Sequence, residues 1–185
     1  LAAGLLERIA RAADVLALVV LAQAKDLIPA PAVTADLVPG AHDGAGERIG
    51  ITTHVASILG SWGHTSPTYF PSPADLGYGN DTMLALQREH PDRIRAYVAV
   101  NPNYADHALA EIDRCLGAGM IGIKLAASRR ANDPLLDPIA VAARTHRVPI
   151  LHHVWQHRRK EWPGQEASDG AELGELAKRH PDVPF

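Results

Sequence analysis

Short apolar runs and amphipathic stretches alternate along the second half of the chain. The apolar runs at residues 95–100, 120–126 and 148–154 have the length and composition of buried strands. Between them, apolar residues recur at helical spacing, and Pro or Gly stands where each pattern stops. The pattern predicts helices from Asp81 to about residue 90, through Leu109, Ile112 and Leu116, from Asp137 to about residue 146, and from Ser168 or Asp169 to about residue 180.

The first 80 residues have a weaker pattern. We expect helices at residues 5–13 and 35–43, strands at 14–22 and 49–58, and a long loop rich in Gly, Pro and Ser at 60–79. At the other end, residues 183–185 resemble the first residues of a further strand.

Strands that alternate with helices indicate βαβ units and hence a parallel sheet. An open nucleotide-binding sheet would carry a Gly-rich turn after its first strand, and no GxGxxG or GxxxxGK[ST] motif occurs in the sequence. A (β/α) barrel of the TIM type is therefore favoured. Because a complete barrel takes roughly 250 residues, we expect the 185 residues to form a single, incomplete barrel domain, 1–185.

Composition and charge limit the kinds of partner that the chain could bind. The chain is 46% hydrophobic and 21% charged, with a formal net charge of -3, so it has no basic field for nucleic acid. Its longest apolar run, residues 15–22, is far shorter than the ~20 residues of a membrane span. The single cysteine, Cys115, fits a reducing compartment. We therefore expect a cytoplasmic protein with a small-molecule substrate.

Two adjacent histidines end the apolar run at 148–154. Strand alternation places His153 and Trp155 on one side and His152 on the other. Barrel active sites lie at the carboxyl ends of the strands, so the inward histidine would stand at the active site. We favour His153 as the inward residue, with Trp155 contacting the substrate and His152 turned towards the helices.

Other polar residues follow the neighbouring strands. Lys124 is expected to point inward above Gly122, as a partner for a substrate carboxylate, a base of lowered pKa or, once carbamylated, a metal ligand. Asn101 ends the preceding strand and could orient a substrate or cap the turn. His54 and His64 flank the long loop, and either could reach the substrate.

Three segments carry a resemblance to a known family: residues 95–103 (RAYVAVNPN), 119–125 (GMIGIKL) and 148–155 (VPILHHVW). They resemble the amidohydrolase-related family, in the branch that contains aminocarboxymuconate semialdehyde decarboxylase. The resemblance implies a barrel with a divalent metal, usually zinc, held by an H-x-H pair on the first strand, a histidine on the fifth and an aspartate on the eighth. His153 matches the fifth-strand histidine.

The sequence departs from that family pattern at the metal site. No H-x-H occurs in it, and residues 14–18 resemble the first strand with Leu16 and Leu18 at the two ligand positions. A catalytic zinc normally needs three protein ligands. We therefore expect that the chain as written does not hold zinc tightly.

Three functions stay open on this reading. The first is a metal-dependent hydrolase that cleaves an amide, ester or lactone bond of a small carboxylated substrate, and the second is a non-oxidative decarboxylase. The third is a non-catalytic fragment or degenerate barrel. An incomplete barrel exposes strand edges, so we also expect a homo-oligomer.

Overall fold

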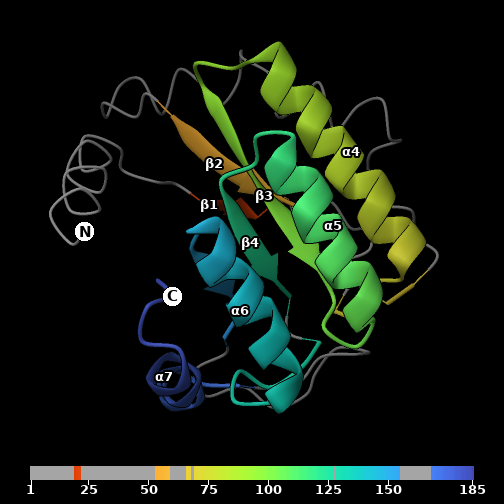
Figure 1. Ribbon diagram of the computed structural model, residues 1–185. Helices are drawn as coiled ribbons and strands as arrows, with labels where there is room; N and C mark the ends of the chain where they lie inside the picture. Colours follow the sequence, from red (N-terminus) through yellow and green to blue (C-terminus); the bar gives the residue numbers. More distant parts are fainter. Residues whose placement is uncertain (1–18, 22–52, 59–65, 68, 127, 155–167) are drawn as a thin grey trace, which may run out of the picture.

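The computed structural model describes residues 19–21 (backbone only), 53–58, 66–67, 69–126, 128–154 and 168–185. Within these residues the chain forms a five-stranded sheet in which every neighbouring pair is parallel and the strands lie in sequence order (Figure 1). The strands are β1 (Val19–Leu21), β2 (His54–Ser57), β3 (Ile94–Val100), β4 (Gly122–Leu125) and β5 (Ile150–His152).

Helices connect the last four strands, and one more helix follows β5 in the chain. They are α4 (Pro73–Glu89), α5 (Ala105–Gly117), α6 (Asp137–His146), which a short 3-10 turn η1 (Pro134–Leu136) precedes, and α7 (Gly170–Arg179). Helices α4, α5 and α6 lie side by side over one face of the sheet (Figure 1). Successive parallel strands joined through helices on one face are the arrangement of a (β/α) barrel, and five strands form part of one. The expected fold class, an incomplete barrel of the TIM type, is confirmed.

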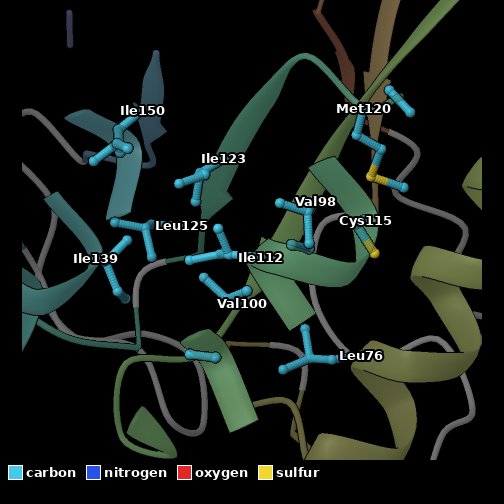
Figure 2. Close-up of a cluster of buried hydrophobic side chains, with 14 of the residues drawn as sticks. Leu76, Val98, Val100, Ile112, Cys115, Met120, Ile123, Leu125, Ile139 and Ile150 are labelled. Carbon is cyan, nitrogen blue, oxygen red and sulfur yellow. The ribbon is translucent and has the colours of Figure 1, made fainter. Parts of the chain in front are cut away.

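The hydrophobic core lies between the sheet and helices α4 to α6. Pairing of Val98 with Ile123, and of Ile123 with Ile150, puts alternate residues of three strands on the helix-covered side. They pack there against buried helix residues such as Ile112 and Ile139 (Figure 2). We call the opposite side of the sheet the inner face. Residues at the intervening strand positions, from Val55 in β2 to Leu151 in β5, belong to it.

Helix α4 begins earlier than the sequence pattern predicts. Ser72 is its N-cap, with a side chain that accepts a hydrogen bond from the Asp75 N–H, and Pro73 follows at the first helical position. Asp81, which we expected to cap this helix, lies inside it and forms an ion pair with Arg114. The predicted loop at 60–79 is therefore wrong from residue 73 onward, because the glycines there are tolerated inside a helix.

A buried asparagine from α4 completes the edge of β3. The pairing of β2 with β3 extends only to the Ala56–Ala96 pair. Further along β3, the Asn80 amide takes the place of a strand: Ala99 N–H donates to Asn80 Oδ1 at 2.9 Å, and Asn80 Nδ2 donates to the Ala99 carbonyl at 2.9 Å. Asn80 Nδ2 also donates to Glu111 Oε1 at 3.0 Å. The side chain thereby satisfies two backbone groups that would otherwise be buried without partners.

Beyond β5 the hydrogen bonding of the sheet continues. The Ile150 N–H donates to the Pro184 carbonyl at 2.9 Å, as the Ile123 N–H donates to the Pro149 carbonyl at the start of the β4–β5 pair. Residues 183–185 thus run beside β5, where their sequence pattern suggested the start of another strand. Among the helices of the described residues, none is both long and apolar enough to cross a membrane.

Candidate active site on the inner face

Lys124 is a lysine buried on the inner face near the carboxyl end of β4. It lies between Ala99 of β3 and Leu151 of β5 in the register and is 1% exposed. Within the described parts of the chain, its ammonium group makes no hydrogen bond or ion pair. Burial lowers the pKa of Lys124 to about 8, because the charged form loses its hydration. At pH 7 most of the molecules still carry this charge.

Gly122, two residues before Lys124, makes room for an aromatic ring. A Cβ at this position would lie 2.6 Å from Cζ of Tyr97, the residue that pairs with Gly122 across the β3–β4 register. The Tyr97 ring therefore lies directly over the β4 backbone on the inner face. Burial raises the pKa of the Tyr97 phenol, so it stays protonated at neutral pH and can act as a hydrogen-bond donor.

The two adjacent histidines occupy opposite sides of β5. His152 pairs with the core residue Leu125 and is therefore on the helix-covered side, buried, as we expected. His153 follows on the inner face, and its N–H donates to the Leu125 carbonyl at 2.9 Å. Its half-buried ring has its centroid 6.1 Å from that of Tyr69.

Both histidines are neutral at pH 7. The pKa of His153 falls to about 4, first because of burial and second because of the positive charge of Lys124. The pKa of His152 also falls to about 4, again mainly through burial, although a backbone hydrogen bond to His153 opposes the shift. A neutral His153 keeps an unprotonated ring nitrogen, but it has no proton to give at neutral pH.

Asn101 is buried at the carboxyl end of β3 and is bonded within the protein. Its Nδ2 donates to the Pro71 carbonyl at 3.0 Å, and its Oδ1 accepts from the N–H and from the Nδ2 of Asn103, at 3.0 and 2.7 Å. These bonds hold the turn after β3 against the segment that leads into α4. They correspond to the second of the two roles that we considered, and a role of Asn101 in orienting a substrate stays a prediction.

The structure does not bring His54 together with these residues. His54 is the first residue of β2 and pairs with Ile94, the first residue of β3, so it lies at the amino end of the sheet and on the helix-covered side. Trp155 and His64, the other predicted residues, lie outside the described residues.

Ser57 is an inner-face residue that the sequence analysis did not single out. It is the last residue of β2, 4% exposed, and its Oγ is buried without a hydrogen-bond partner. The signal that indicates it is the alternation of β2: Ala56 pairs with the core residue Ala96, so Val55 and Ser57 face the other way.

The described residues do not fit a tightly held divalent metal. Among them, no group of three or more His, Cys, Asp or Glu side chains is arranged to hold a metal ion. The neighbour that affects the titration of His153 most is the cation of Lys124, and a positive neighbour disfavours a metal ion. Lys124 therefore opposes metal binding at His153.

Comparisons with known proteins agree with this architecture. A family model described as amidohydrolase matches residues 76–185. The chain is similar to the crystal structure of 2,6-dihydroxybenzoate decarboxylase from Rhizobium, with 16% identity and a TM-score of 0.62 over 79% of this chain and 54% of that one. It is also similar to 5-carboxyvanillate decarboxylase from Sphingomonas paucimobilis, with 16% identity and a TM-score of 0.59 over 85% and 54% of the two chains.

A third similar structure contains a metal. It is a dihydroxybenzoic acid decarboxylase from a Polaromonas species with bound manganese and the inhibitor 2-nitroresorcinol, 15% identical, with a TM-score of 0.58 over 84% of this chain and 57% of that one. The chain spans about half the length of these solved structures. At such identities the likeness shows the fold. None of the curated proteins matches the chain by sequence.

Proposed function

We propose that this chain, which belongs to the amidohydrolase family of enzymes, acts on a small molecule whose carboxylate binds Lys124. The observation that carries the proposal is the position of this ammonium group, which is buried on the inner face and makes no ion pair with any described residue. The site lies at the end of the sheet where barrel enzymes bind their substrates.

The energetics favour an anion as the partner of Lys124. A buried charge without a partner is costly, and burial is what lowers the pKa of Lys124 to about 8. A carboxylate would offset that cost with a charge-assisted hydrogen bond, which is about twice as strong as one between neutral groups. Within the same proposal, Trp155 contacts the rest of the substrate, and His153 contributes a neutral ring nitrogen.

Non-oxidative decarboxylation is the reaction that we favour. It is supported by the similar structures, several of which are decarboxylases of aromatic acids. The bond between the substrate carbon and its carboxylate breaks, carbon dioxide leaves, and the electron pair stays on the carbon, which then takes up one proton. Lys124 is the better donor of that proton, because it is mostly protonated at pH 7, whereas His153, with a pKa of about 4, is not.

Hydrolysis of an amide, ester or lactone bond is the second candidate, supported by the family model. Both reactions are metal-dependent in the resemblance that we drew from the sequence. Zinc, which the family resemblance implies, and manganese, which one similar structure contains, need more ligands than the described residues provide, and we assign no step to a metal. A cytoplasmic location and a homo-oligomer stay predictions from the sequence.

Ligand binding tests the proposal directly. The chain is titrated calorimetrically with 2,6-dihydroxybenzoate and with benzoate, and carbon dioxide release is followed with carboxyl-labelled substrate. The variant Lys124→Met should weaken carboxylate binding by about 10- to 100-fold, the size of a hydrogen bond to a charged group. Lys124→Arg, which keeps the charge, should retain part of the affinity.

A matched control separates the site from the general charge of the protein. Lys178 is an exposed lysine in the last turn of α7, and Lys178→Met should bind the carboxylates as the unchanged protein does. Equal affinity in the Lys124→Met and Lys178→Met variants would contradict the proposal. Release of a new carboxylate from an ester or lactone, without carbon dioxide, would favour hydrolysis over decarboxylation.

A further inference from the structure

Ser57 and Lys124 are two polar side chains on the inner face that are buried and have no described partner. Ser57 is 4% exposed and Lys124 is 1% exposed. The Oγ of Ser57 makes no hydrogen bond, and the ammonium group of Lys124 makes none with the described residues. Each stands at or next to the carboxyl end of its strand, in β2 and β4 respectively.

Leaving such groups without partners costs stability. A buried hydroxyl without a hydrogen bond costs about 1–3 kcal/mol, and most buried polar groups in folded proteins are bonded for this reason. Two such groups on one face, at the end of the sheet where barrels bind ligands, are expected where a ligand supplies the missing bonds.

The inner face between the two side chains includes a small residue. Strand β3 separates them, and its inner-face residue beside Lys124 is Ala99, which contributes only a methyl group. The Tyr97 ring lies over Gly122 of β4, two residues before Lys124 on the same face. Two strand spacings of ~4.8 Å each lie between β2 and β4. A ligand that reaches both polar groups is therefore about as long as an aromatic ring with a substituent at each end.

We propose that Ser57 is the second polar contact of the ligand that Lys124 binds, and that it determines specificity for a hydroxyl or similar group at the end opposite the carboxylate. This inference rests on the proposed function, since it takes Lys124 as the carboxylate partner. The Ser57 hydroxyl can donate to or accept from such a group. A ligand that carries a carboxylate alone leaves Ser57 without a partner and binds more weakly.

A pair of probe ligands isolates this contact. Benzoate and para-hydroxybenzoate have the same carboxylate and ring and differ by one distal hydroxyl. The unchanged protein should bind para-hydroxybenzoate about 2- to 10-fold more tightly, the range of one neutral hydrogen bond. Ser57→Ala should remove this preference and leave the affinity for benzoate unchanged. Lys124→Met should lower the affinity for both ligands. Circular dichroism shows that each variant is folded.

The control variant is Ser128→Ala. Ser128 is also buried, with an Oγ that lacks a partner, but it lies in the turn after β4 and outside the strands. It should keep the preference for the hydroxylated ligand. If Ser57→Ala keeps that preference while Lys124→Met loses both ligands, this inference is wrong and the proposed function stands. If Lys124→Met binds benzoate as tightly as the unchanged protein, or the unchanged protein binds neither ligand, both are overturned.

Discussion

Replacing Lys124 with methionine should make the protein more stable. Methionine has a similar length and no charge, so it removes a cation that is buried without a described partner. The pKa of Lys124 is about 8 in the folded chain against an ordinary value of 10.5. Each unit of pKa corresponds to about 1.4 kcal/mol, so the charged lysine costs the folded state at most about 3–4 kcal/mol. Many domains have a total stability of only about 5–15 kcal/mol.

The pH dependence of this gain has a definite sign. The unfolded chain binds the lysine proton more tightly than the folded chain does, so the penalty is fully present below pH 8 and disappears as the pH rises towards 10.5. Urea unfolding is followed by far-ultraviolet circular dichroism at pH 7, 9 and 10. The free energy of unfolding of Lys124→Met should exceed that of the unchanged protein by a margin that shrinks at each step. Lys178→Met, at an exposed position, should show no such margin.

Two results would refute this reasoning. A Lys124→Met variant that is less stable at pH 7 would mean that the ammonium group has a strong partner in the folded chain. A margin that does not change between pH 7 and pH 10 would mean that the lysine titrates normally. The expected result also serves the binding experiments, because a variant that is more stable and yet loses carboxylate binding has not lost it through unfolding.

Three further predictions concern the surroundings of the site. Asn80→Leu leaves the N–H and carbonyl of Ala99 without partners and should lower the free energy of unfolding by about 2–5 kcal/mol in urea melts, with near-normal stability as the contrary result. Gly122→Ala places a Cβ 2.6 Å from the Tyr97 ring and should cost about 1–3 kcal/mol, a cost that should disappear in the Tyr97→Ala background. His152, with its pKa of about 4 against an ordinary 6.5, favours folding above pH 6.5 and loses that contribution as the pH falls towards 4. His152→Leu should therefore reduce the acid sensitivity of the melting temperature, and an unchanged slope would count against the assigned burial.

Strand alternation was enough to predict the faces of the central strands. In β4, apolar residues on both sides of Lys124 left it the odd position, and the register confirms that Ile123 and Leu125 are on the helix-covered side. The same rule separated His152 from His153. These predictions succeed because the side-chain period of a strand is two and does not depend on distant contacts.

Contacts between distant residues were beyond the reach of the sequence pattern. Asn80 bonds to Ala99, 19 positions away, and nothing in a helix containing Gly77 and Gly79 indicates that its asparagine completes the edge of a strand. The helix start at Ser72 was missed for a related reason, because the glycines favoured a loop. His54 is at the amino end of the sheet because β2 begins there. The sequence pattern did not predict this start, because apolar residues also precede His54.

The charge of Lys124 bears on which of the ligands that the sequence left open the inner face would favour. At neutral pH Lys124 is mostly cationic and His153 is neutral, and the lysine is one of the two causes of the low pKa of His153. A metal ion placed beside His153 would meet this same positive charge, which disfavours it as it disfavours the histidine's own proton. A carboxylate meets the opposite condition. This difference supports the proposal that Lys124 binds a carboxylate.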